Sequence, residues 1–290
     1  MNDRYNIAYI NNKQVSLDVA ATIINGKTYI PLKFVATATG ETVSWDSSSK
    51  TLTMSRSYAI GTANELTYWI HLDTGVVNKA SAKNPGRKIG QLDLDLFILE
   101  KFDVIKLSEY SSYIYFYEVI GPSATVKNSG QVLIVNDKIV DYGKLQVLGF
   151  FPLTNIHQAE DNVLITDGKT AKFLNKQGEL KFSYNLTEIM EKDEAYLIES
   201  HNNDFMILRE YNSQHLIVYD FRTKKVIYVH EVIDLPVYEK EYLIQAGLDR
   251  ANEMQSVHII TFDKVDNQGN LLFKYKSKKT DQMDTYQLAL

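Results

Sequence analysis

The chain has 290 residues, enough for about two domains, and its 44% hydrophobic and 23% charged residues are typical of a globular protein. Its net charge is −5, and the acidic excess lies after residue 56, where 25 Lys and Arg stand against 32 Asp and Glu. Because nucleic-acid affinity comes largely from Lys and Arg that displace counterions, we expect no nucleic-acid partner. The absence of Cys excludes disulfides, thiolate metal sites and Cys nucleophiles.

The composition favours strands, since 19 Tyr and 12 Phe suit half-buried sheet surfaces. No run of 18 apolar residues occurs, so the sequence predicts no membrane-spanning helix. Residues 1–4 are polar and lack the features of a signal peptide.

The N-terminal part predicts three hairpins and one helix. The first two hairpins turn at Asn11-Asn12 and at Asn25-Gly26, the second being the strongest short hairpin signal. The helix begins at Pro31, ends at Gly40, and carries an apolar stripe at Leu32, Val35, Ala36 and Thr39.

The third hairpin pairs residues 42–45 with residues 51–54 around an Asp-Ser-Ser-Ser-Lys turn, and we expect Trp45 to fill the core. Together these elements predict a small antiparallel sheet wrapped on one helix. Gly26, Pro31, Gly40 and Trp45 all have structural roles in this interpretation, and none supplies chemistry.

Residues 7–56, and above all the run 24–35 with Gly40 and the segment 43–46, resemble the copper amine oxidase-like N-terminal domain, or stalk domain. This family occurs on exported proteins of Gram-positive bacteria. The resemblance implies an extracellular or cell-surface mature form whose leader has been removed. It also suggests two domains, at residues 1–56 and 57–290.

Amine oxidase activity is not expected, because in that family the reaction belongs to a separate catalytic domain. The cofactor Tyr of that domain follows an Asn, and no Asn-Tyr pair occurs here. Its copper needs a His-x-His pair, whereas the six His of this chain lie at least 14 residues apart. No cofactor or metal is indicated.

Residues 57–290 carry hairpin signals at a regular spacing. The turns lie near Gly75, Gly130, Gly178, Thr223 and Gly269, in steps of 55, 48, 45 and 46 residues. This spacing is typical of propeller blades, so we predict a five-bladed β-propeller, with a β-sandwich as the alternative.

Three strands that precede these hairpins, residues 113–119, 162–166 and 205–209, are expected to line the channel. Residues 285–290 are expected to complete the first blade. A short helical turn is predicted over residues 186–194, with Thr187 as its cap.

Two pairs of residues are weak candidates for catalysis. Asp93 and Asp95 would share one face of a strand, and paired carboxylates are what glycosidases need. Glu199 and His201 lie before a strand and could act as an acid/base pair. A solvated strand face and a polar turn explain the same patterns.

Tyr113, Tyr115 and Tyr117 fall on one face of a strand and are weak candidates for ligand binding, because exposed aromatic rings stack on sugars. Packing between blades explains the same pattern.

The sequence therefore favours a non-catalytic, exported binding or scaffold protein whose partner is a cell-wall polymer or another surface protein. The alternative is a polysaccharide hydrolase or lyase with carboxylates at the propeller channel.

Overall fold

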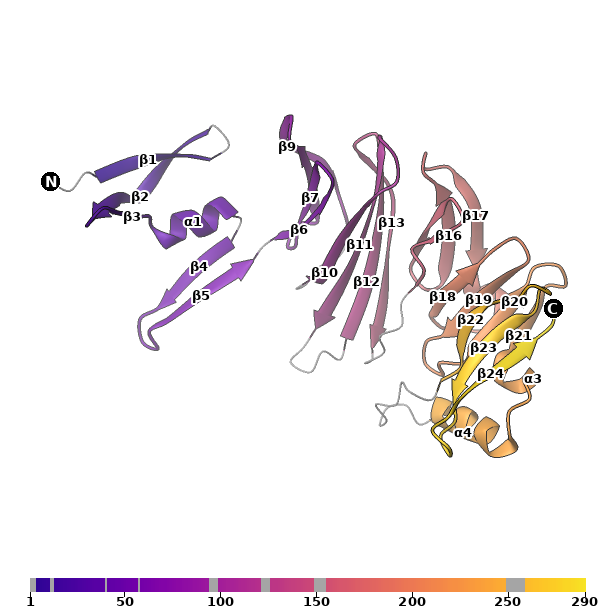
Figure 1. Cartoon of the computed structure of the whole chain (residues 1–290). Coiled ribbons are helices and arrows are strands. Elements are labelled where there is room, and N and C mark those ends of the chain that lie inside the picture. Colours follow the sequence, from indigo (N-terminus) through magenta and orange to yellow (C-terminus); the bar gives the residue numbers. More distant parts are fainter. Residues whose placement is uncertain are drawn as a thin grey trace. The chain divides into compact units, whose positions relative to one another are not determined.

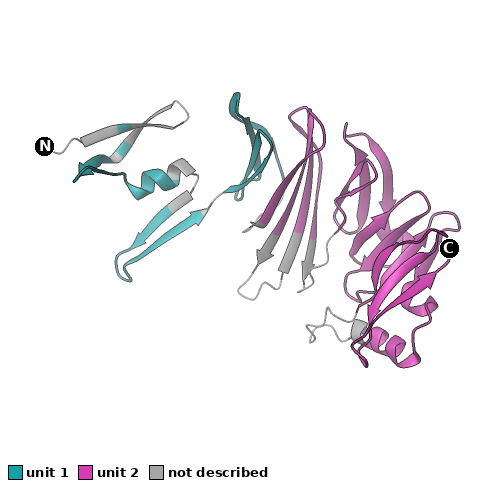
Figure 2. Cartoon of the chain, in the orientation of Figure 1, with its two compact units in different colours: residues 1–97 teal, residues 98–290 magenta. Residues whose placement is uncertain are grey.

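The computed structural model describes residues 4–10, 13–39, 41–56, 58–93, 99–120, 126–148, 155–248 and 259–290. The chain divides into two compact units, Met1–Phe97 and Ile98–Leu290 (Figure 2). The expected domain boundary after residue 56 falls within the first unit and stays a prediction.

The first part of unit 1 contains the predicted hairpins and helix, but the strands form two sheets, β1-β2-β3 and the separate pair β4-β5, and not one sheet wrapped on the helix. Of the described side chains of the expected apolar stripe, only Ala36 is buried, since Leu32 and Val35 are 45% and 41% exposed. The three-stranded sheet has the order β1-β2-β3, and the two expected hairpins share the long strand β2. Asn25 and Gly26 have φ angles of 52° and 73°, as the hairpin turn requires. Asn11-Asn12 and Gly40 lie outside the described residues. The elements are β1 (Arg4–Ile10), β2 (Lys13–Ile24), β3 (Lys27–Tyr29), α1 (Leu32–Thr39), β4 (Glu41–Asp46) and β5 (Thr51–Arg56).

The second part of unit 1 is a four-stranded antiparallel meander with the order β6-β7-β8-β9. Gly75 ends the turn between β7 and β8 with a φ of +66°, and a Cβ there would lie 2.1 Å from the Leu92 carbonyl oxygen. The predicted turn therefore needs a glycine. The strands are β6 (Tyr58–Ala63), β7 (Leu66–His71), β8 (Val76–Ser81) and β9 (Asn84–Gln91).

In its described residues, unit 2 is a series of antiparallel meanders, three with four strands and a last one with three. We call them sheet D, sheet E, sheet F and sheet G in chain order. Sheet D contains β10 (Leu99–Lys106), β11 (Ser111–Ile120), β12 (Val126–Val135) and β13 (Lys138–Leu148); sheet E contains β14 (Gln158–Ala159), β15 (Asn162–Thr166), β16 (Thr170–Asn175) and β17 (Leu180–Asn185); sheet F contains β18 (Tyr196–His201), β19 (Phe205–Glu210), β20 (Leu216–Asp220) and β21 (Lys225–Tyr228); sheet G contains β22 (Thr261–Val265), β23 (Leu271–Lys276) and β24 (Met283–Leu288).

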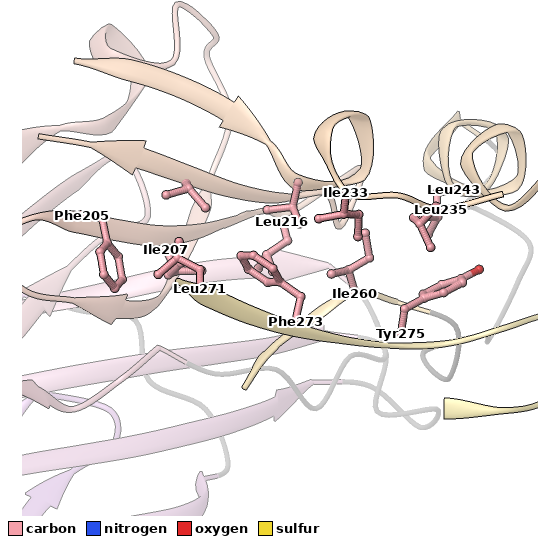
Figure 3. Close-up of a cluster of buried hydrophobic side chains, with 12 residues drawn as sticks. Phe205, Ile207, Leu216, Ile233, Leu235, Leu243, Ile260, Leu271, Phe273 and Tyr275 are labelled. Atoms are coloured by element: carbon pink, nitrogen blue, oxygen red, sulfur yellow. The ribbon is translucent and has the colours of Figure 1, made fainter. Parts of the chain in front are cut away.

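Consecutive sheets of unit 2 pack face to face through separate hydrophobic clusters, one between D and E, one between E and F, and one between F and G. In β19 the alternation is direct, since Met206 and Leu208 face sheet E while Phe205 and Ile207 face sheet G. Figure 3 shows the last cluster, in which Phe205 and Phe273 lie among aliphatic side chains. A sheet with both faces buried by further sheets is the packing of propeller blades, not of a two-sheet sandwich. The fold is mainly β, as expected, and the number of five blades stays a prediction.

One predicted hairpin is wrong. Residues 126–135 form the single strand β12, and the turn that follows is Asn136-Asp137, with φ angles of 50° and 59°. Gly130 sits within β12 because the Phe116 ring crosses it, so that a Cβ would lie 2.0 Å from the ring. The glycine allows close packing and does not mark a turn. Residues 123–125 lie outside the described residues.

Two further expectations about strand order are also wrong. The strands expected to line a channel are the second strands of sheets D, E and F, because β10, β14 and β18 precede them. The C-terminal strand β24 pairs with β23 in sheet G and does not complete the sheet β6–β9.

Helices interrupt the series at two places. After sheet E, α2 (Leu186–Ile189) is capped by the Asn185 side chain, which accepts from the Glu188 N–H at 3.2 Å, and not by Thr187 as expected. After sheet F, α3 (Val229–Val232) and α4 (Val237–Leu248) cover one end of the F–G cluster (Figure 1). The Glu239 carboxylate in α4 accepts from the Tyr275 hydroxyl at 2.6 Å and the Ser277 hydroxyl at 2.5 Å, which fixes the helix on sheet G.

Candidate functional site

Glu199, a candidate for catalysis, is the counter-ion of a buried arginine. Its carboxylate accepts from Nε of Arg209 and, at 3.1 Å, from Nη2. The Arg209 side chain is fully buried in β19 and also donates to the carbonyl oxygens of Gln214 and Ile260, both at 2.8 Å. All of these bonds hold the arginine charge inside the protein, where an unpaired charge is costly. The pair ties sheet F to the segment that enters sheet G.

His201, the other member of that candidate pair, lies in an aromatic cage. Its ring centroid is 4.1 Å from that of Phe173 and 5.5 Å from that of Phe221, and its Nε2 is 3.0 Å from the Tyr184 hydroxyl. Burial lowers the pKa of His201 to about 4. The imidazole is therefore neutral near pH 7 and serves as part of the packing between sheets E and F.

A β-bulge explains why Glu199 and His201 do not act together. The pairing of β18 with β19 shifts by one residue between Ile198 and Ser200. Beyond the shift His201 lies opposite Met206, whose side chain faces sheet E, while Glu199 bonds Arg209 toward sheet G. Residues two apart on a regular strand share a face, but the extra residue of a bulge reverses that.

The Tyr candidates divide between the protein interior and the surface. Tyr113 and Tyr115 are buried in the cluster between sheets D and E, and the Tyr113 hydroxyl donates to the Leu164 carbonyl at 2.9 Å. Tyr117 is partly buried and packs edge-on against Tyr115, with ring centroids 4.6 Å apart. Of the three rings, Tyr117 keeps accessible surface for a ligand.

A histidine joins this row of tyrosines. The His157 ring lies 4.1 Å from that of Tyr115, and its Nδ1 and the Tyr115 hydroxyl are both buried without a hydrogen bond of standard geometry. Burial, with a smaller contribution from Lys101, lowers the pKa of His157. Lys101 itself pairs with Asp103 at 2.8 Å on β10.

The first carboxylate pair lies only half within the described residues. Asp93 lies two residues beyond the end of β9, and Asp95 lies outside the described residues.

A buried charged cluster that sequence analysis missed lies at one end of sheet F. Lys192 bridges the carboxylates of Glu194, at 2.8 Å, and Glu210. The Ser213 hydroxyl also donates to Glu210, and His215 lies 3.9 Å from it. Burial opposes ionisation of Glu210, but the bonds from Lys192 and Ser213 outweigh it and keep the pKa of Glu210 below its usual value.

Beside this cluster the rings of His215 and His230 lie against each other, with centroids 4.3 Å apart and planes tilted by 33°. Burial and then the neighbouring His215 lower the pKa of His230 to about 4. No sequence motif marked these residues, because they come from separate loops and strand ends. Within the described ranges, no group of three His, Asp or Glu side chains could hold a metal ion.

The clearest surface feature is an apolar face on the hairpin β4–β5. Trp45 is 60% exposed, so the expectation that it fills the core is wrong. It pairs across the strands with Leu52, and on the same face two residues along, Val43 pairs with Met54. Leu52 and Met54 are exposed as well. We call these four residues the hairpin face. Contiguous exposed apolar side chains mark interaction sites.

The family comparison agrees with the resemblance seen in the sequence. Residues 1–54 match the model of the copper amine oxidase N-terminal domain. This match covers α1 and the hairpin face. No curated protein sequence matches the chain.

Solved structures show only distant likeness. Virginiamycin B lyase from Staphylococcus aureus is 11% identical with a TM-score of 0.32, over 80% of this chain and 70% of that one. A streptogramin B lyase is 10% identical with a TM-score of 0.27, over 80% of this chain and 83% of that one. A chain of a nidogen/laminin complex is 12% identical with a TM-score of 0.27, over 63% of this chain and 69% of that one. Likenesses this weak carry no argument about function.

None of the helices in the described parts of the chain is long and apolar enough to cross a membrane.

Proposed function

We propose that the protein is a non-catalytic binding or scaffold protein displayed outside the cell of a Gram-positive bacterium. The observation that carries this proposal is the hairpin face, which lies within the segment that matches the copper amine oxidase N-terminal domain. An exposed Trp with aliphatic neighbours suits stacking on sugar rings or docking on another protein. The proposed partner is a cell-wall polymer, with a second surface protein as the alternative.

Two site contacts also support a non-catalytic role. Glu199 neutralises the charge of Arg209, and His201 is neutral within its aromatic cage. Both side chains therefore stabilise the fold, and proton transfer by either one would disturb these contacts. A hydrolase or lyase needs a group that exchanges protons with solvent and substrate.

The test is co-sedimentation of the full chain with purified Gram-positive cell walls, followed by assay of the supernatant for soluble sugar. We expect the chain to pellet without releasing sugar, and Trp45→Ala to weaken binding by about tenfold or more, as the loss of an aromatic anchor does. Tyr110→Ala is the matched control, since Tyr110 is an equally exposed aromatic residue in unit 2.

Release of soluble sugar would favour the polysaccharide hydrolase or lyase instead. If the chain does not pellet, wall binding is wrong. Equal binding of the two Ala variants and the wild type would exclude the hairpin face as the contact.

A further inference from the structure

Residues 229–248, which contain α3 and α4, form one side of the F–G cluster. Figure 3 shows Ile233, Leu235 and Leu243 of this segment beside the buried side chains of the two sheets. The structure describes every residue of the segment, and none of them belongs to a strand. The segment can therefore open while both sheets stay paired, and opening would uncover apolar side chains of the cluster.

Two histidines join this segment to sheet F. His215, the residue before β20, has its Nε2 3.2 Å from the Leu243 carbonyl oxygen in α4. The ring of His230, in α3, lies against that of His215, with centroids 4.3 Å apart. His230 is only 4% exposed, so the contact between the two rings is part of the buried interface between the segment and sheet F.

The surroundings of His230 suit a neutral imidazole. Its Nδ1 is buried and has no hydrogen-bond partner. The charged and titratable groups that act on it are His215 beside β20, Lys240 from α4 and Glu210 from β19. The ring centroid of Tyr228, at the end of β21, is 6.0 Å from that of His230. A proton on His230 would therefore create a buried cation close to a lysine.

Glu210 offers little compensation for such a cation. Its carboxylate already accepts from Lys192 and from the Ser213 hydroxyl. Of the influences on the pKa of His230, that of Glu210 is the weakest. Because a buried charge without a partner of its own is costly, protonated His230 is more stable once the segment has opened into water.

We propose that His230 is an acid-sensitive latch, whose protonation loosens residues 229–248 from sheet F and uncovers the F–G cluster. The latch goes beyond the proposed binding function, since it uses no residue of the hairpin face and does not depend on what the protein binds.

The direction and size of the effect follow from where His230 titrates. Burial, followed by His215 and Lys240, lowers its pKa to about 4 in the docked segment, whereas a His in water titrates near 6.5. Docking is thus at full strength above about pH 6.5 and weakens as the pH falls from there toward about 4. The opening equilibrium of the segment should rise by roughly 30-fold between about pH 8 and about pH 5.

His201 supplies the matched control. Burial lowers its pKa to about 4 as well, but its ring lies in the aromatic cage between sheets E and F, against Phe173 and Tyr184. An opening confined to residues 229–248 leaves this cage closed, whereas unfolding of the whole of unit 2 exposes both histidines. The two histidines therefore separate a local opening from a global one.

The test is hydrogen exchange of the full chain, followed by mass spectrometry at about pH 8 and about pH 5 and expressed as protection factors, which remove the intrinsic pH dependence of exchange. We expect residues 229–248 of the wild type to lose protection by roughly 30-fold at the lower pH. His201→Phe should show the same loss. His230→Phe, which keeps a ring on His215 but takes up no proton, should show little of it, and His230→Gln serves as a second variant that does not titrate.

Equal protection of residues 229–248 at the two pH values would overturn the proposal. So would a full loss of protection in correctly folded His230→Phe and His230→Gln, because another group would then sense the acid. If His201→Phe reduced the loss as much as the His230 variants do, the segment would open only with the whole unit, and the latch would be wrong.

Discussion

Replacing Glu199 with Gln should destabilise unit 2, because Arg209 would keep its buried charge and lose its carboxylate. Breaking a buried ion pair by removing one partner typically costs about 3–5 kcal/mol. The loss here should be near the lower end, about 3 kcal/mol, since Arg209 retains the carbonyl oxygens of Gln214 and Ile260 and the amide oxygen of the substituted side chain can accept one bond.

For a unit of this size, 1 kcal/mol corresponds to roughly 2–4 °C in Tm, so the expected fall is roughly 6–12 °C. Far-UV circular dichroism is the suitable probe. Both Trp residues, Trp45 and Trp69, lie in unit 1, so Trp fluorescence would miss the transition of unit 2.

Glu179→Gln is the matched control, because Glu179 forms an exposed pair with Lys181 at 3.0 Å and such pairs contribute about 0–1 kcal/mol. The double variant Glu199→Gln, Arg209→Met should regain part of the lost stability, because it removes the unpaired buried charge while leaving the carbonyl oxygens of Gln214 and Ile260 without that donor. If Glu199→Gln melts within about 1 °C of the wild type, the ion pair is not structural and Glu199 is available for another role.

Three further predictions concern packing, pH and the docked helix. Gly130→Ala should cost about 2 kcal/mol in thermal melts, because its Cβ would overlap the Phe116 ring, and an unchanged Tm would contradict the packing described. Since burial lowers the folded-state pKa of His201 to about 4, the unfolded chain takes up a proton first as the pH falls from about 6.5, and stability is lost toward pH 4. His201→Phe should reduce that loss in melts recorded across the range, and an equal slope would refute the assignment. Glu239→Gln weakens the bonds from Tyr275 and Ser277, so amide exchange in α4 should speed up by about tenfold, equivalent to about 1.4 kcal/mol, while exchange in sheet E stays unchanged.

Turn chemistry explains most of what could be predicted from the sequence. Asn25-Gly26 and Gly75 have the positive φ angles that their turns need, so the hairpins around them were predicted correctly. Gly130 was misread, because a glycine also allows an aromatic ring to approach the backbone. The true turn, Asn136-Asp137, uses two residues that tolerate the left-handed region without any glycine.

Periodicity failed where the buried positions are not apolar or not evenly spaced. Among the α4 side chains that the structure describes, the buried ones are Glu239 and Leu243, so a search for apolar stripes does not detect the helix. The bulge in β18 is a tertiary feature, and nothing in the local sequence shows that the side chains of Glu199 and His201 point to opposite faces of sheet F. Trp45 was assigned to the core by residue type alone, and residue type does not distinguish a core ring from a docking ring.

The clusters of unit 2 have a consequence for how the chain unfolds and evolves. Each cluster joins only two consecutive sheets, so stability should be close to a sum of neighbour terms along a one-dimensional array. On the face of sheet G away from the F–G cluster, Lys274 pairs with Asp263 at 2.7 Å. Opening should therefore proceed sheet by sheet. A lineage could also lengthen or shorten such an array by whole sheets while leaving the inner ones untouched.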